Sequence, residues 1–471
     1  MAALSSTARA QPPPQPAPPQ QPAPQAPPTT PPPAAPEANW APPPPQEAPP
    51  PSTTPKPAQP TTSEPSWAPP PEEQPPQATS PVLPETPAEV AAAKAEEAGT
   101  RFEIYGFAML DIGYDFGQIG NPLWQDVLRP TKLPAFDDEF GKGPRTFAGV
   151  RQSRLGVKAS TPTDMGPIDT TFEFELFGVG VDEGQTTFRL RHVYGDWWQL
   201  RAGQTWSPFM DPDVFPNSLE YWGPNGMVFF RNVQLAWMPI RGDSRVTVAL
   251  ERPGASPDTG IYVNRIELEN VVARFPAPDV SAEARYGGDW GYVEAAGILR
   301  YIRWDDLDPA APDLDGHVWG WGVNLSSNVK LGPALLKLQA VYGHAIENYM
   351  NDAGADVAPE LATDPANPLD GDALPVLGLV AFVDMEWSKL FTSTAGYSFV
   401  WIDNTSGQRP DAFHIGHYAL ANLEFHPYEK LMMGGEFQWG RRENFDDGFA
   451  VNDFRLQFSV RFNFAQVFGG E

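Results

Sequence analysis

The sequence predicts an all-β protein: an antiparallel transmembrane β-barrel of about 16 strands, preceded by a disordered Pro-rich N-terminal segment. Apolar and polar residues alternate with a period of two from Arg101 onward, the pattern of strands with one apolar and one wet face. The composition, with 41% hydrophobic, 19% charged and 12% aromatic residues, suits such strands. No window approaches the roughly 18 consecutive apolar residues of a transmembrane helix, so a helical membrane protein is excluded.

The N-terminal hundred residues differ in composition from the rest, since they hold 33 of the 57 prolines. Residues 11–85 are expected to form a disordered Pro-rich tail in the periplasm, because such a segment cannot bury a core. Residues 1–10 end in Ala8-Arg9-Ala10, which resembles a signal-peptide cleavage site and suggests a remnant of one. A chance Ala-rich match is the alternative. Residues 86–99 are expected to form a short helix, with Pro87 near its start and Gly99 at its end.

The alternation is clearest in the last predicted strand. Phe454, Leu456 and Phe458 fall on one face, and Arg455 and Gln457 fall on the other. A half-buried strand of a soluble protein would show the same alternation, but a run of large apolar side chains with an aromatic end favours a membrane strand. The barrel is predicted to span residues 101–464, with a C-terminal tail at 465–471.

Similar runs predict the other strands. Their expected ranges are 102–116, 147–160, 168–180, 186–195, 197–206, 228–240, 244–252, 279–288, 291–304, 317–330, 334–346, 376–387, 390–403, 414–426, 430–443 and 453–464. Short turns alternate with long loops at 117–146, 207–227, 253–278, 305–316 and 347–375, and an even strand number places both barrel ends in the periplasm. A soluble sandwich or propeller is the competing fold, but no repeat of about 40 residues supports a propeller.

Charge and composition exclude several functions. The formal net charge of −27 argues against a nucleic-acid partner, which requires basic patches. Cysteine is absent, which removes disulfides and thiolate metal sites. No cofactor, metal site or catalytic residue is expected. The expected partners are outer-membrane lipid and lipopolysaccharide around the barrel.

Three stretches carry a resemblance to a known family. They are Arg151-Gln152-Ser153-Arg154-Leu155-Gly156, the run from Tyr194 to Phe209 that begins Tyr-Gly-Asp-Trp-Trp, and Tyr286-Gly287-Gly288-Asp289-Trp290-Gly291 with Ala296 to Arg300. In these the chain resembles the DcaP-like outer-membrane porins over roughly residues 101–464. The resemblance implies a homotrimer of sixteen-stranded barrels that admits small anionic or dicarboxylic solutes. The Pro-rich tail departs from the helical, coiled-coil-like N-terminal segment of that family, which puts trimerisation through the tail in doubt.

The candidate site residues are inward charges near the narrowest section, because porins select by size and electrostatics. The loop 207–227, which carries Asp211, Asp213 and Glu220, is expected to fold inward as the constriction; an ordinary surface loop is the alternative. A pore-lining basic row is expected to face it. This row consists of Arg154, Lys158, Arg189, Arg191 and Arg201.

Arginine suits recognition of carboxylates, because its planar fork binds them bidentately and stays charged. The alternative is that the pore-lining acids Glu173 and Glu175 pair with this row and only brace the wall. On the closing strand, Arg455 and Arg461 are expected to lock the barrel by ion pairs to Glu103 and Asp111 of the first strand.

The sequence is compatible with three functions. The first is a passive diffusion channel for small hydrophilic solutes, since a barrel of this size leaves an aqueous lumen. The second is a structural outer-membrane anchor, whose Pro-rich arm reaches peptidoglycan or a periplasmic protein. The third is a barrel enzyme, which requires a clustered catalytic site that the sequence does not display.

Overall fold

The computed structural model describes residues 99–117, 120–141, 143–262, 268, 270–307, 314–364 and 367–469. The predicted signal remnant 1–10, the Pro-rich tail 11–85 and the predicted helix 86–99, apart from Gly99, lie outside these residues. Within the described ranges the helical segments are 3₁₀ turns, and no helix is long and apolar enough to cross a membrane.

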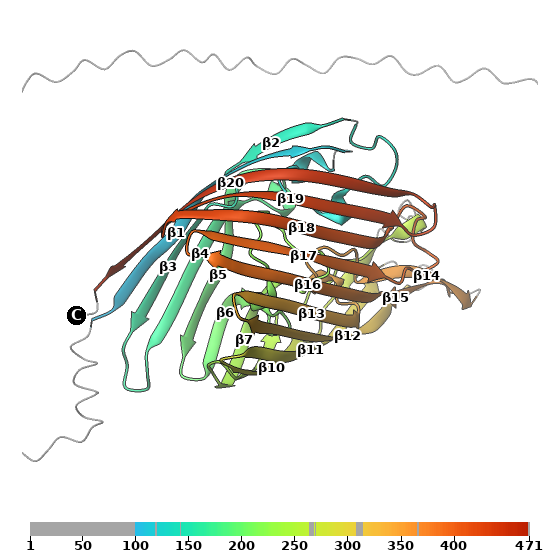
Figure 1. The fold of residues 1–471 in the computed structure, drawn as a ribbon. Helices are drawn as coiled ribbons and strands as arrows, with labels where there is room; N and C mark the ends of the chain where they lie inside the picture. The colour runs from blue at the N-terminus through green and yellow to red at the C-terminus, as the bar shows by residue number, and fades with distance from the viewer. Residues whose placement is uncertain are drawn as a thin grey trace, which may run out of the picture. The chain divides into compact units, whose positions relative to one another are not determined.

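The described residues form one large antiparallel sheet of 18 strands and a separate hairpin (Figure 1). The sheet consists of β1 (Arg101–Asp115), β2 (Arg145–Gly149), β3 (Arg154–Thr161), β4 (Ile168–Phe177), β5 (Thr186–Trp197), β6 (Leu200–Trp206), β7 (Arg231–Ile240), β8 (Arg245–Glu251), β9 (Val271–Arg274), β10 (Asp279–Gly288), β11 (Gly291–Asp306), β12 (Gly316–Leu331), β13 (Ala334–His344), β16 (Pro375–Ser388), β17 (Phe391–Ile402), β18 (Phe413–Tyr428), β19 (Leu431–Asn444) and β20 (Ala450–Phe468). The hairpin is β14 (Val357–Asp364) and β15 (Asn367–Ala373).

The sheet closes into a barrel because β1 pairs with β20 on one side and with β2 and β3 on the other. β2 and β3 pair with successive parts of β1, and β9 and β10 pair with successive parts of β11. Each of these two pairs of strands therefore fills one position in the wall. The 18 strands occupy sixteen positions, so the predicted sixteen-stranded antiparallel barrel is confirmed.

Polar side chains point into the barrel and apolar side chains point out. On β20, Leu456 and Phe458 are 49% and 45% exposed, whereas the alternating Gln457 and Ser459 are 0% exposed. This is the reverse of a soluble protein, in which large apolar side chains are buried. The outer surface is suited to hydrocarbon, and the alternation that predicted the strands has this physical origin.

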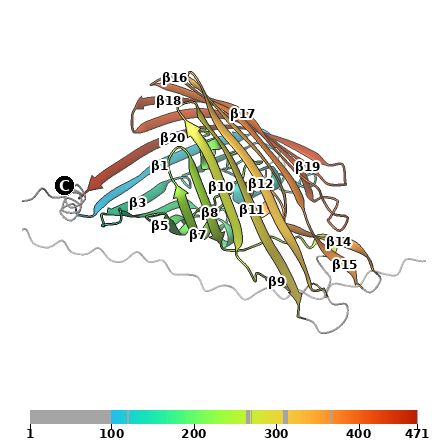
Figure 2. The ribbon, with the colours of Figure 1, turned by 90° about the horizontal axis from the view of Figure 1, so that it is seen from below.

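The strands differ in length around the wall. β6 and β8 have seven residues each, whereas β12 and β18 have 16 each. Figure 2 shows the long strands β11 and β12 extending beyond the shorter β8 and β10. The loop between β6 and β7 therefore begins where the wall is short, so it can fold into the barrel.

The structure differs from several predicted boundaries: the predicted strand 147–160 is divided into β2 and β3, and β9 lies in the predicted loop 253–278. Two further differences concern the end of the barrel and the loop 347–375. β20 continues to Phe468, because residues 465–468 pair with residues 102–105 of β1; the predicted C-terminal tail thus begins later than residue 465. The alternation ends near Phe464 although the pairing does not, since the last side chains are exposed on both faces. In the predicted loop 347–375, Val357–Asp364 and Asn367–Ala373 form the hairpin β14–β15.

The interior of the barrel holds an apolar cluster contributed by loops. Phe209, Met227 and Val228 of the loop after β6 pack with Ile346 and Tyr349 of the loop after β13, and each is at most 1% exposed. Leu128 and Leu133 of the loop after β1 belong to the same cluster. Three loops therefore fold into the barrel and fill part of its cross-section.

Candidate pore constriction and arginine cluster

The loop from Ser207 to Phe230 crosses the lumen and is held by two opposite parts of the wall. Asp211 accepts hydrogen bonds from the hydroxyls of Tyr292 on β11 (2.7 Å) and Ser326 on β12 (2.6 Å). Farther along the loop, the amides of Leu219 and Glu220 donate to Glu436 on β19, at 2.7 and 3.1 Å. The loop lies inside the barrel.

The three acidic residues predicted on this loop mainly hold it in place. Asp211 and Asp213 bind Arg285 of β10, at 2.6 and 2.5 Å. Glu220 is 2% exposed and accepts hydrogen bonds from the amides of Trp222 (2.9 Å) and Gly223 (2.6 Å). Only Asp213, whose side chain is half exposed, presents much of its carboxylate to water.

The buried position of Glu220 affects its protonation. Burial raises the pKa of Glu220 to about 7, opposed by the hydrogen bonds from Gly223 and Trp222. Glu436 adds a nearby like charge, whereas Arg455 acts in the opposite direction. This loop carboxyl group therefore titrates near neutral pH.

An arginine cluster lies on the inner face of β3, β4, β5 and β7. Arg191 binds Glu173 at 2.7 Å and Glu175 at 2.5 Å, and Arg189 lies 3.4 Å from Glu175. Arg154 lies 3.5 Å from Glu173 and 3.8 Å from Glu175. The structure therefore brings together three of the five predicted basic residues and both predicted acids.

A fourth arginine, Arg231, joins this cluster at the first position of β7, 3.7 Å from Glu175. It lies within the predicted strand 228–240 but was not assigned to the basic row; in the structure it stands where the inward loop returns to the wall. The sequence feature that could have identified Arg231 is its position directly after Phe229 and Phe230. Four guanidinium groups surround two carboxylates, so the cluster carries an excess of positive charge.

The other two predicted basic residues lie apart from the cluster. Arg201 on β6 forms a bidentate pair with Asp196 across the turn from β5, with both distances 2.7 Å. Lys158 on β3 lies 3.6 Å from Glu103 of β1, and its side chain is half exposed. The predicted single row of five is thus wrong: the strand register places Arg201 and Lys158 nearer the short-turn end of the barrel.

The predicted closure pairs also need correction. Arg455 binds Asp115 of β1 at 2.5 Å, rather than Glu103 or Asp111. Asp111 instead accepts a hydrogen bond from Ser459 at 2.6 Å. Arg461 lies 5.7 Å from the ring centre of Phe107, and its Nε has no hydrogen-bond partner among the described residues. Register explains the difference, because Arg455 pairs directly with Asp115 across the seam.

Two cavities adjoin these groups. One, of about 390 Å³, is lined by Arg129, Arg189 and Arg231, by aromatic side chains that include Trp222, and by Glu347. The other, of about 320 Å³, is lined by Arg201 and other residues near the turns from β5 to β6 and from β7 to β8. The first lies beside the end of the inward loop, where it returns to β7, and the second lies beside the start of that loop, after β6.

Arg129 was not predicted as a site residue, because it lies on a loop without strand alternation. Its guanidinium is stacked between the rings of Trp124 and Trp222, at 4.3 and 3.9 Å from their centres. It also binds the buried Asp352 at 2.9 Å. The loop after β1 thereby adds a positive group to the larger cavity.

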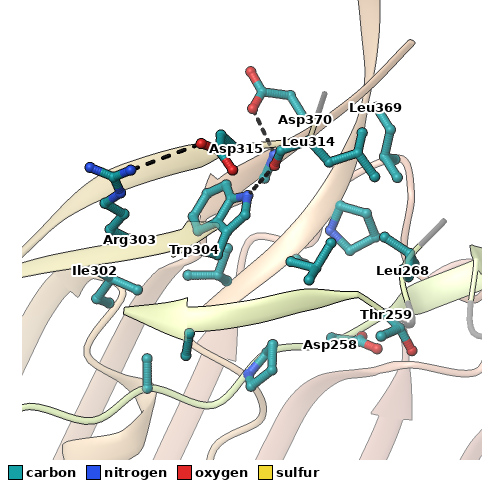
Figure 3. A pocket seen from close by; sticks show the side chains of 18 residues that line it. Asp258, Thr259, Leu268, Ile302, Arg303, Trp304, Leu314, Asp315, Leu369 and Asp370 are labelled. Atoms are coloured by element: carbon teal, nitrogen blue, oxygen red, sulfur yellow. Dashed lines mark hydrogen bonds and ion pairs between the residues drawn. The ribbon is translucent and has the colours of Figure 1, made fainter. Parts of the chain in front are cut away.

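A third, mostly apolar pocket of about 200 Å³ lies where the end of β11 meets β14, β15 and the loop after β8. In Figure 3, Trp304 stands at its centre, with its indole N–H donating to the carbonyl of Leu314 at 2.8 Å. Arg303 points away from the pocket toward Asp315 (Figure 3). The arginine cluster contributes nothing to this pocket.

Comparisons with known proteins agree with this architecture. Residues 91–284 match the family model of the DcaP outer membrane protein. Among solved structures, the outer membrane channel DcaP of Acinetobacter baumannii is 20% identical, with a TM-score of 0.63 over 78% of this chain and 98% of that chain. The anion-selective porin from Comamonas acidovorans is 10% identical, with a TM-score of 0.49 over 78% of this chain and 100% of that one. None of the curated protein sequences matches this chain significantly.

The family match covers the first half of the barrel, and the shared fold covers the whole of it. Sixteen strand positions, an apolar outer surface and inward loops are the features of an outer-membrane porin. Residues 91–284 thus resemble the DcaP outer membrane protein, as the sequence motifs suggested, and the barrel shares its fold with the DcaP channel.

Proposed function

We propose that the protein is a passive diffusion channel of the bacterial outer membrane that favours small anionic solutes, including dicarboxylates. The supporting observation is the arginine cluster: Arg154, Arg189, Arg191 and Arg231 surround only Glu173 and Glu175. Arg189 and Arg231 also line a cavity beside the inward loop. An anion that passes this point meets fixed positive charge in a confined space, where electrostatic interactions are stronger than in bulk water.

The two carboxylates give the cluster its rigidity. Glu175 binds Arg189 and Arg191 and accepts a hydrogen bond from the hydroxyl of Tyr221 on the inward loop. Bracing and solute attraction are therefore compatible roles, because the carboxylates fix the guanidinium groups without neutralising all of them. The side chains of Arg154 and Arg189 are 25% and 27% exposed, so solute can reach both.

Charge selectivity in planar bilayers tests this proposal. The double variant Arg154→Gln/Arg189→Gln should shift the reversal potential in a KCl gradient toward cation selectivity, because two accessible positive charges are lost. Arg409→Gln, an exposed arginine outside the strands, is the matched control and should leave the reversal potential unchanged. An unchanged reversal potential in the double variant would refute the role of the cluster.

A second function is proposed for the Pro-rich segment 11–85: a periplasmic arm that links the barrel to peptidoglycan or to a periplasmic protein. The composition of the segment favours an extended chain, which at about 3.1 Å per residue could reach roughly 200 Å. Deletion of residues 11–85 should leave conductance intact and weaken resistance of the envelope to detergent. Unchanged envelope resistance would argue against the arm.

The proposed assembly is a homotrimer in outer-membrane lipid and lipopolysaccharide, as the resemblance to the DcaP-like porins implies. Light scattering of the detergent-solubilised protein, corrected for detergent, should give three times the chain mass. A mass equal to that of one chain would refute the trimer but not the channel proposal, since each barrel encloses its own lumen.

A further inference from the structure

We propose that the cavity of about 390 Å³ beside the inward loop binds zwitterionic solutes, the class of free α-amino acids, through a guanidinium group at one side and a carboxylate at the other. This inference rests on the proposed channel function and specifies a solute class for it. Among the described residues, the cavity wall contains buried donors without hydrogen-bond partners and a buried carboxyl group without a side-chain partner.

The cationic side of the site is Arg231. Its Nη2 lies 3.7 Å from Glu175, but its Nη1 is buried and has no hydrogen-bond partner in the described part of the chain. The indole N–H of Trp124, which lines the same cavity, is also buried without a partner. A buried donor without an acceptor is destabilising, so a carboxylate that accepts from these groups would be bound favourably.

The anionic side is Glu347, which begins the 3₁₀ turn Glu347–Tyr349. The residue is 2% exposed, and its carboxylate has no side-chain partner within the described ranges; only the backbone amides of Ile346 and of Glu347 itself face it. The guanidinium of Arg300 lies 2.9 Å from Asp356 and pairs with that residue. Arg300 is therefore not a dedicated partner of Glu347. Burial raises the pKa of Glu347 well above its ordinary value, and the negative charge of Asp356 adds to this effect.

The two sides are held on adjacent segments. The amide of Phe229, two residues before Arg231, donates to the carbonyl of Tyr349 at 2.9 Å. Asn232 Nδ2 donates to the hydroxyl of Tyr349 at 3.3 Å. These bonds fix the turn that carries Glu347 against the start of β7, so the two charged groups line one cavity from neighbouring backbone.

The charge pattern selects among solutes. A simple dicarboxylate would bind Arg231 but would leave the buried carboxyl group of Glu347 without a counterion, and a simple amine would be repelled by the arginine cluster. An α-amino acid supplies a carboxylate for Arg231 and an ammonium group for Glu347. Pairing the ammonium group with Glu347 would offset the cost of burying that carboxylate.

Block of the single-channel KCl current by L-aspartate and by succinate tests the inference, since the two solutes share a carbon skeleton and differ by the ammonium group. In the wild-type protein at pH 7, aspartate should block at a concentration about tenfold lower than succinate, as expected for one added charge-assisted contact. Glu347→Gln should abolish this difference, and Glu360→Gln, an exposed glutamate on β14 that does not line the cavity, should preserve it.

The outcomes separate the inference from the channel proposal. A wild-type protein without KCl conductance would refute the channel itself. Normal conductance with equal block by the two solutes in the wild-type protein would overturn the zwitterion site, whether or not the Glu347→Gln variant folds. An aspartate preference that persists in a conducting Glu347→Gln variant would equally overturn it. Arg231→Lys should weaken block by both solutes, because a lysine cannot reproduce the guanidinium fork.

Discussion

At the scale of single residues, Glu220 links the inward loop to pH. Its pKa in the folded protein is about 7, against an ordinary value of 4.5, so the folded state retains a proton that the unfolded state releases. The corresponding stability is fully present below about pH 4.5 and is lost as the pH rises through 7; the difference corresponds to about 3 kcal/mol. The groups that face Glu220 are Glu436, Tyr418 and Arg455.

We therefore expect the temperature at which the barrel unfolds in detergent to fall between pH 5 and pH 8. Glu220→Gln should remove most of this pH dependence, because the amide does not titrate. It should also lower stability at acid pH by about 1–3 kcal/mol, since an amide N–H cannot accept the hydrogen bonds that the Gly223 amide and the Tyr418 hydroxyl now donate to Oε2. Heat-induced unfolding followed by gel mobility at several pH values would measure both effects. An equal pH dependence in the variant would assign the titration to another group.

The sequence predicted the residues of the site unevenly, for a physical reason. Arg189 and Arg191 were predicted because strand alternation sends every second side chain inward. Arg129 lies on a loop, where no period applies, and Arg231 is the first residue of β7, next to the inward loop. Only the folded loops reveal that Arg231 joins the cluster and that Arg129 lines the cavity beside it. Lys158 and Arg201 were predicted on the correct face of the wall. Their positions along the barrel axis depend on strand register, which alternation does not specify.

At the scale of elements, the inward loop depends on a close approach at Gly226. A Cβ at this position would lie 2.0 Å from the carbonyl oxygen of Phe399 on β17, and the Gly226 amide donates to the hydroxyl of Ser398 at 2.9 Å. Any side chain there would push the loop away from the wall. The loop therefore reaches β17 only because this residue is glycine.

Gly226→Ala should displace the loop, lower stability by about 1–3 kcal/mol and alter single-channel conductance by a measurable factor. Gly435→Ala on β19 is the matched control, since nothing lies within 4 Å of a Cβ at that position. Conductance histograms and heat-induced unfolding of both variants would check this. If the two variants behaved alike, the position of the loop would not govern the pore.

The strands were predictable and the loops were not. Hydrocarbon outside and polar groups inside impose a two-residue period on every strand, and the predicted and observed strands agree closely along the wall. The hairpin β14–β15 lies outside this wall and lacks that constraint, so the region was predicted as a loop. The inward folding of residues 207–227 was predicted by analogy with sixteen-stranded porins, because the sequence alone does not show whether a loop folds into the barrel or away from it.

At the scale of the whole molecule, the barrel reverses the side-chain distribution of a soluble protein: polar groups are buried inside and large apolar side chains cover the outside. Loops that enter from β1, β6 and β13 fill part of the interior with an apolar cluster. One cavity lies beside Arg189 and Arg231 of the arginine cluster, and another is lined by Arg201 and Arg245 nearer the short turns. Fixed positive charge thus lines the space that solute can occupy.

The proposed channel conducts ions through this lumen, and its arginine cluster favours anions. The most direct measurement is the current through the purified full-length protein in a planar bilayer that separates two KCl concentrations. We predict discrete conductance steps and a reversal potential whose sign reports preferential passage of chloride. A bilayer that remains silent, or a reversal potential of the opposite sign, would contradict the account.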